Sequence, residues 1–92
     1  MKPFQYTYLG RVLSATADHY TEGRYNRYRI TLGKETFIIA PSGFTGANGR
    51  TIWVQPVKPG EKDQHHDLVQ ALGEGLEAYG IIRSMQNRQR KV

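Results

Sequence analysis

The sequence contains no cysteine, and none of its apolar runs approaches the length of a membrane-spanning helix. Without cysteine the chain forms no disulfide and offers no thiolate to zinc, so packing must hold it together and a reducing compartment suits it. Met1 and Lys2 are not followed by the apolar segment that a signal peptide needs. We therefore expect a cytoplasmic protein that has no membrane partner.

The length and composition favour one small domain. A chain of 92 residues can bury a single modest core, but it has little interior left for a deep active-site cleft. Six tyrosines, three phenylalanines and one tryptophan argue for a real core, because each ring buries a large area. The formal net charge of +5 favours anionic partners, either nucleic acid or an acidic protein surface, although simple solubility explains it equally well.

Alternating apolar and polar residues predict four β-strands before the final element. Phe4, Tyr6 and Tyr8 alternate with polar residues, and the alternation changes phase at Gly10, which indicates a bend in one long first strand. A polar connection at 18–23 follows. The other three strands are expected at 27–32, 36–40 and 51–55.

Turn residues separate these strands. Gly33 is expected to supply a positive φ in a two-residue turn, and Pro41 to end the third strand because it cannot donate to the ladder. Three glycines and the Asn48–Gly49 pair predict a loop over 42–50.

The last element is an amphipathic helix that begins between Asp63 and Asp67 and ends at Tyr79. Its apolar stripe is formed by Leu68, Leu72 and Leu76. One of the two aspartates is expected to cap its N-terminus. Gly73 and Gly75 lie inside the helix, where each costs roughly 1 kcal/mol relative to alanine, and such glycines indicate close approach to a sheet.

These elements predict an α+β fold, a four-stranded antiparallel β-meander with the C-terminal helix packed on one face. The domain is expected to span residues 1–82, and residues 83–92 to form a basic C-terminal tail that is frayed or disordered. One helix covers only one face of such a sheet. The other face must be polar, pair with a second copy to give a homodimer, or meet a partner.

Arginine and tyrosine alternate in the second strand, as in surfaces that bind single-stranded nucleic acid. The candidate contact residues there are Arg24, Tyr25, Arg27 and Arg29, joined by Trp53, which is out of phase with its strand neighbours. The alternative interpretation places the tyrosines in the sheet core and leaves the arginines as ordinary solvated neighbours.

Two further segments supply candidate contacts. The glycine-rich loop carries Phe44 and Arg50, and the basic tail carries Arg83, Arg88, Arg90 and Lys91 with no acid. The loop matches neither the P-loop nor the dinucleotide fingerprint, so a hairpin loop explains its glycines better than a phosphate cradle. The tail is either a nucleic-acid arm or a solubilising end.

No constellation in the sequence indicates catalysis, a metal or another cofactor. His65 and His66 project about 100° apart on a helix, so they do not converge on one ion, and a polar helix entrance explains them. No serine stands in a nucleophile-elbow pattern. We therefore expect a protein that is not an enzyme.

The leading hypothesis is a small nucleic-acid-binding module that acts through the Arg/Tyr-rich sheet surface and the basic tail. The alternative is a protein-directed inhibitor or adaptor, for example a small phage-encoded protein that blocks a host defence or nucleic-acid machine. It would act through the uncovered sheet face and the glycine-rich loop.

Overall fold

The computed structural model describes residues 2–56 and 63–79, which form one antiparallel sheet and one helix. The strands pair in chain order, each with the next one along the sequence. They are β1 (Lys2–Tyr8), β2 (Arg11–Glu22), β3 (Tyr25–Leu32), β4 (Glu35–Thr45) and β5 (Thr51–Val54). The helix α1 spans His66–Ala78.

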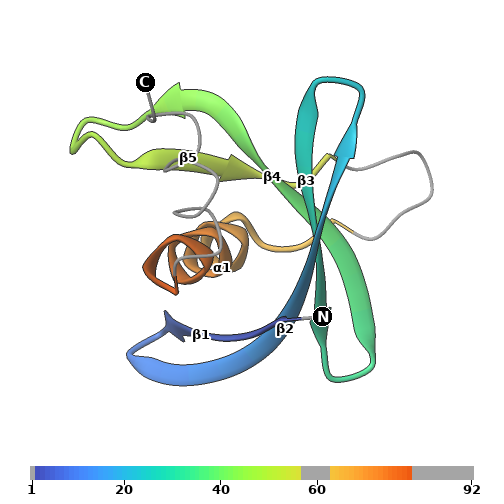
Figure 1. Ribbon diagram of the computed structural model, residues 1–92. Helices are drawn as coiled ribbons and strands as arrows, with labels where there is room; N and C mark the ends of the chain where they lie inside the picture. Colours follow the sequence, from blue (N-terminus) through green and yellow to red (C-terminus); the bar gives the residue numbers. More distant parts are fainter. Residues whose placement is uncertain (1, 57–62, 80–92) are drawn as a thin grey trace.

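The sheet is curled, and α1 lies in its concave side between the two edge strands (Figure 1). The helix contacts β1 at one edge, and β5 and β4 at the other. The α+β class and the C-terminal helix on one sheet face are therefore confirmed. Because the helix bridges both edges, the curled sheet and the helix enclose a single core.

The predicted count of four strands is wrong, because the long first strand is two strands. Tyr8 pairs with Arg11 across a two-residue turn formed by Leu9 and Gly10. Both turn residues have positive φ, 53° and 76°, as a type I′ hairpin turn requires. Leucine rarely adopts a positive φ, so its presence in the sequence does not indicate a turn. The glycine alone indicates only a bend.

The polar connection expected at 18–23 is also wrong. These residues continue β2 to Glu22, which pairs with Tyr25 across a turn at Gly23. They are polar because they form the far end of a hairpin, where burial is slight on both faces. The turn at Gly33 is confirmed, since its φ is 59° and Leu32 pairs with Glu35 across it.

Pro41 does not end β4 as predicted, although the ladder between β3 and β4 does stop before it, at Ile39. Beyond that point β4 pairs with β5 alone, with Pro41 opposite Trp53. The Trp53 N–H is turned away from β4 toward α1, so this is a non-hydrogen-bonded pair. The proline nitrogen therefore faces the β3 side, where no donor is needed.

The core is built from the concave face of the sheet and the apolar stripe of α1. Its largest fully buried side chains are those of Trp53, Tyr28 and Phe4, and no buried side-chain N or O atom among the described residues lacks a hydrogen-bond partner. The remaining core residues are Tyr6, Ala15, Ala17, Ile30, Phe37, Ile39, Val69, Leu72 and Leu76.

Two glycines let α1 approach the sheet closely, as predicted. A Cβ at Gly73 would overlap the indole ring of Trp53, and a Cβ at Gly75 would lie 2.7 Å from the backbone oxygen of Gln5. The predicted aspartate cap is wrong. His65 is the N-cap residue, and its Nδ1 accepts a hydrogen bond from the backbone N–H of Asp67 at 3.2 Å.

Candidate binding surfaces

The outer face of the β2–β3 hairpin carries the arginine and tyrosine residues that sequence reasoning selected. Opposite residues of an antiparallel pair share a face, and here Tyr20 lies opposite Arg27 and Glu22 opposite Tyr25. The Arg29 guanidinium carbon lies 5.1 Å from the centroid of the Tyr20 ring, and that of Arg27 lies 5.3 Å from the centroid of Tyr25. Two guanidinium groups thus lie over two tyrosine rings on one face.

The charges on this face are partly balanced by acids. The Nε of Arg27 lies 3.4 Å from Oε1 of Glu22, and Arg29 is directly opposite Asp18 in the register. Arg24 is exposed at the turn and has no such neighbour in the register. The face therefore combines stacking surface with a small surplus of positive charge.

Tyr20 belongs to this face and is missing from the sequence-based set. Period-two alternation would have placed it beside Asp18 and Glu22, but only if residues 18–23 had been recognised as strand. The missed element therefore explains the missed residue.

Trp53 does not belong to this face, and its predicted place beside Arg27 and Arg29 is wrong. Its side chain is fully buried under α1, where it contacts Tyr28 edge-on at 5.6 Å between ring centroids. The indole N–H donates to Oε1 of Glu77 at 2.9 Å. The alternation correctly separates Trp53 from Ile52 and Val54, but the helix covers the face on which Trp53 lies.

The buried ring of Tyr28 contacts the ring of His19, which lies near the open end of the concave face. The two rings lie 5.0 Å apart between centroids, and Nε2 of His19 is 2.9 Å from Oδ1 of Asn26. Burial raises the pKa of Tyr28 to about 12, because the phenolate form would have to leave water. This tyrosine is therefore a core residue, as the alternative interpretation proposed for the tyrosines of β3.

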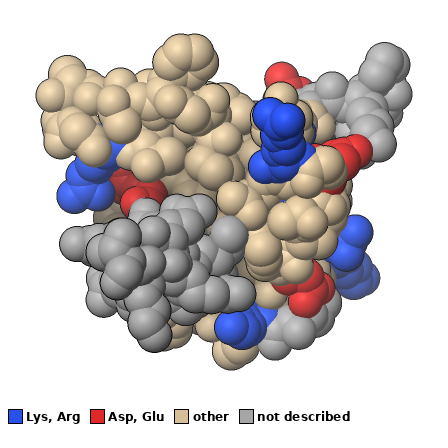
Figure 2. Space-filling model, turned by 45° about the horizontal axis from the view of Figure 1, so that its top comes forward, with Lys and Arg blue, Asp and Glu red and all other residues tan. Residues whose placement is uncertain are grey.

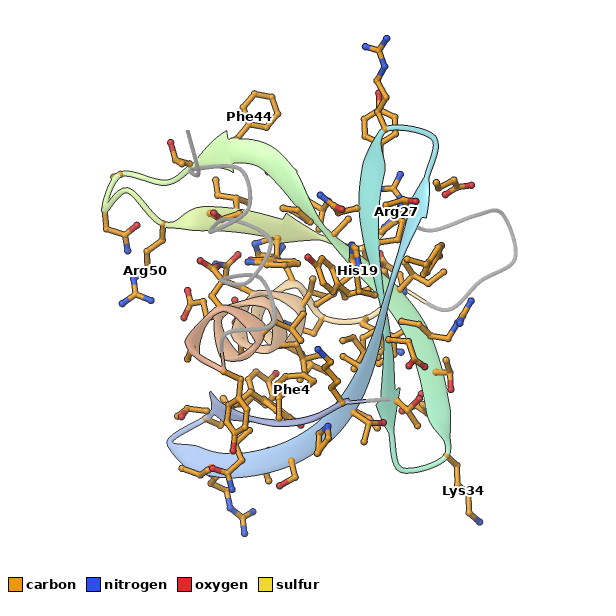
Figure 3. The ribbon with its side chains drawn as sticks, in the orientation of Figure 1. Phe4, His19, Arg27, Lys34, Phe44 and Arg50 are labelled. Carbon is orange, nitrogen blue, oxygen red and sulfur yellow. The ribbon has the colours of Figure 1, made fainter. Side chains whose placement is uncertain are left out.

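The β4–β5 hairpin presents a different surface. Phe44 is 73% exposed and projects from β4 away from α1 (Figure 3). Arg50, at the far side of the same hairpin, has its Nη1 at 3.6 Å from Oε1 of Glu74 on the helix. This hairpin therefore offers an aromatic contact without an unbalanced charge.

The described residues carry no surplus charge as a set. Seven lysines and arginines and seven aspartates and glutamates lie in 2–56 and 63–79, so the net charge of +5 belongs entirely to 57–62 and 80–92. On the face shown in Figure 2, the basic side chains stand apart from one another, and acidic side chains lie beside several of them. Arg27, Lys34 and Arg50 likewise lie on separate parts of the molecule (Figure 3). Arg83, Arg88, Arg90 and Lys91 lie outside the described residues.

A recess of about 230 Å³ lies at the start of β4 near Gln64, at the helix entrance. Its polar lining comes from Glu35, Thr36, Gln55 and Gln64, and its apolar lining from Phe37, Ile38 and Pro56. This volume is below the usual range for small-molecule sites. Within 2–56 and 63–79, no three histidine or acidic side chains lie close enough to hold a metal ion.

At 13 residues, α1 is not long or apolar enough to cross a membrane, and no other helix occurs in the described part of the chain. No protein-family model, curated protein or solved structure gives a significant match to this chain.

Proposed function

We propose that this protein is a non-enzymatic module that binds single-stranded nucleic acid through the outer face of the β2–β3 hairpin, assisted by the basic residues of 83–91. The observation that carries the proposal is the arrangement of Arg29 over Tyr20 and Arg27 over Tyr25 on one outward face. This arrangement lies on the face opposite the helix-covered core, where Tyr25 and Arg29 are exposed and Tyr20 and Arg27 are half-buried.

Stacking is the contribution expected from the sheet face. Tyr25 is 64% exposed at the end of the hairpin, so its ring has surface available for a base. Base–aromatic stacking tolerates any sequence, because every base has a π-face, and arginine adds cation–π contacts.

Phosphate attraction is the contribution expected from outside the described domain. All four basic residues that follow α1 in the sequence lie in the acid-free segment 83–91, whereas the described residues are balanced in charge. Counterion release by these residues would make the affinity fall as salt rises. The interaction is thus divided between an electrostatic segment and a stacking face.

A fluorescently labelled 20-nucleotide poly-dT strand, titrated across a salt series, tests the proposal. For Tyr25→Ala we expect a loss of about 5- to 150-fold in affinity at every salt concentration, since a stacked base contributes roughly 1–3 kcal/mol. Replacement of Arg83, Arg88, Arg90 and Lys91 by glutamine should instead reduce the salt slope by roughly 3, because each phosphate neutralised on a single strand contributes about 0.7 to the slope.

Lys34→Gln is the matched control, because it removes one exposed positive charge at the β3–β4 turn, away from the proposed face. It should change neither the affinity nor the slope appreciably. No binding at low salt, or unchanged affinity in Tyr25→Ala, would refute the proposal.

A further inference from the structure

Phe44 is a large apolar side chain that the core does not use and that the proposed nucleic-acid face does not include. It is 73% exposed, and it points outward from β4 on the side away from α1 (Figure 3). Val54, on the paired strand β5, is also exposed. The β4–β5 hairpin therefore has two exposed apolar side chains.

The backbone around Phe44 sets its direction. Between the pairs Pro41–Trp53 and Thr45–Thr51, β4 advances four residues while β5 advances two, which is a bulge. Gly43 adopts a φ of 89° within it, and the backbone N–H of Phe44 donates to Oγ of Ser42 at 3.1 Å. Bulges commonly re-aim a side chain near a functional surface. Phe44 is thus presented by a strand with defined hydrogen bonds.

The hairpin is also almost free of charge. From Ala40 to Val54 the sequence holds one charged residue, Arg50, which is paired with Glu74. Interface cores are depleted of charged residues and enriched in aromatic ones, and a few aromatic anchors carry most of the binding energy. An uncharged hairpin with one protruding ring has this composition.

We propose that the β4–β5 hairpin docks on a different protein, with Phe44 entering an uncharged, apolar pocket of that partner. The lack of charge on the hairpin favours an uncharged protein pocket as the binding partner, because the hairpin has no unpaired charged side chain with which to bind a phosphate or an acidic surface. A second copy of this chain fits less well. Its recess near the helix entrance places Phe37, Ile38 and Pro56 beside the polar side chains of Glu35, Thr36, Gln55 and Gln64, and a phenyl ring entering it would take these polar groups out of water.

Photo-crosslinking from position 44 of the full chain tests the proposal. p-Benzoylphenylalanine would replace Phe44 in cells of the native host, with Leu9 replaced in a parallel control. Leu9 is 81% exposed on the β1–β2 hairpin, so the control has similar exposure on another part of the molecule. We expect position 44, and not position 9, to crosslink to one partner protein at apolar residues that line a pocket.

The crosslinked protein would then be purified and its affinity measured. Phe44→Ala should weaken binding at least 30-fold, as a buried aromatic anchor does, and Leu9→Ala should leave it unchanged. Both side chains are exposed, so both variants should keep the melting temperature of the parent.

Support requires both results, the mapped apolar pocket and the selective loss in Phe44→Ala. The inference is overturned by a crosslink to a second copy or to nucleic acid, by no crosslink, or by equal affinities for the two alanine variants. It does not depend on the proposed nucleic-acid function. Tyr25→Ala should not affect docking, and Phe44→Ala should not affect poly-dT binding.

Discussion

The side chain of Gln70 pairs with the backbone at Trp53 as a neighbouring strand would. Its Oε1 accepts from the Trp53 N–H and its Nε2 donates to the carbonyl oxygen of Thr51, both at 2.9 Å. A further bond from Nε2 to Oε2 of Glu74, at 3.0 Å, holds the amide in place. One helix residue therefore provides hydrogen-bond partners for two backbone groups at the outer edge of β5. An open edge strand could pair with another chain.

Replacing Gln70 by methionine should expose the importance of this pairing. The variant keeps a long side chain but leaves the partly buried N–H of Trp53 without its acceptor. We expect a loss of roughly 1–3 kcal/mol in the free energy of unfolding, measured by urea denaturation. Hydrogen exchange at the Trp53 amide should accelerate as well. Exchange at the parent rate would contradict the assigned pairing.

Gly73→Ala should destabilise the protein although alanine favours helices. The gain in helix propensity is about 1 kcal/mol, but the new methyl group would overlap the Trp53 ring. Overpacking of this kind costs about 1–3 kcal/mol or more, so we expect a net loss of stability in thermal and urea unfolding. The double variant Gly73→Ala with Trp53→Leu should show coupling, because the smaller side chain leaves room for the methyl group. Strict additivity would refute the contact.

Leu9→Asn should stabilise the β1–β2 hairpin. Leu9 holds a φ of 53°, which costs a non-glycine residue roughly 1–2 kcal/mol, and asparagine tolerates it far better. The side chain is exposed, so little burial is sacrificed. We expect a gain of about 1 kcal/mol in the free energy of unfolding, whereas Leu9→Ala should give no comparable gain. Equal effects would show that the turn carries no such strain.

Stability should fall steeply at alkaline pH because of Tyr28. Its folded-state pKa of about 12 exceeds the usual value of 10.0, so between these values the unfolded chain loses a proton that the folded chain keeps. Unfolding is then favoured by about 1 kcal/mol for each pH unit, and below pH 10 the effect disappears. Burial also raises the pKa of Tyr6, with a smaller contribution from Tyr8, in the same direction.

Urea unfolding from pH 9 to 12 measures this dependence. Tyr28→Phe removes the titrating hydroxyl and should flatten the pH profile relative to the parent. Tyr25→Phe, which removes an exposed hydroxyl from the same strand, is the matched control. An unchanged profile in Tyr28→Phe would contradict the assignment.

The candidate surfaces were predictable only in part. Alternation along β3 correctly places Arg27 and Arg29 together. The loop expected over 42–50 is wrong for Phe44, because β4 continues through a bulge to Thr45 and Phe44 lies in that strand. Tyr20 was missed because polar residues at the end of a hairpin resemble a loop. The proposed roles of these residues remain predictions.

The elements that could be predicted from the sequence are those with local signals. Strand alternation, the glycine turn at Gly33 and the apolar stripe of α1 all follow from short-range periodicity and backbone preference. The close approach at Gly73 and Gly75 was also visible, because glycine inside a helix is otherwise unfavourable.

Which sheet face the helix covers, and therefore the burial of Trp53, depends on the tertiary fold. Period-two alternation shows which residues share a face but not which face is buried, because that depends on contacts between distant segments. The curl of the sheet and the pairing of Gln70 with β5 arise in the same way. Each depends on long-range packing that no stretch of a few residues encodes.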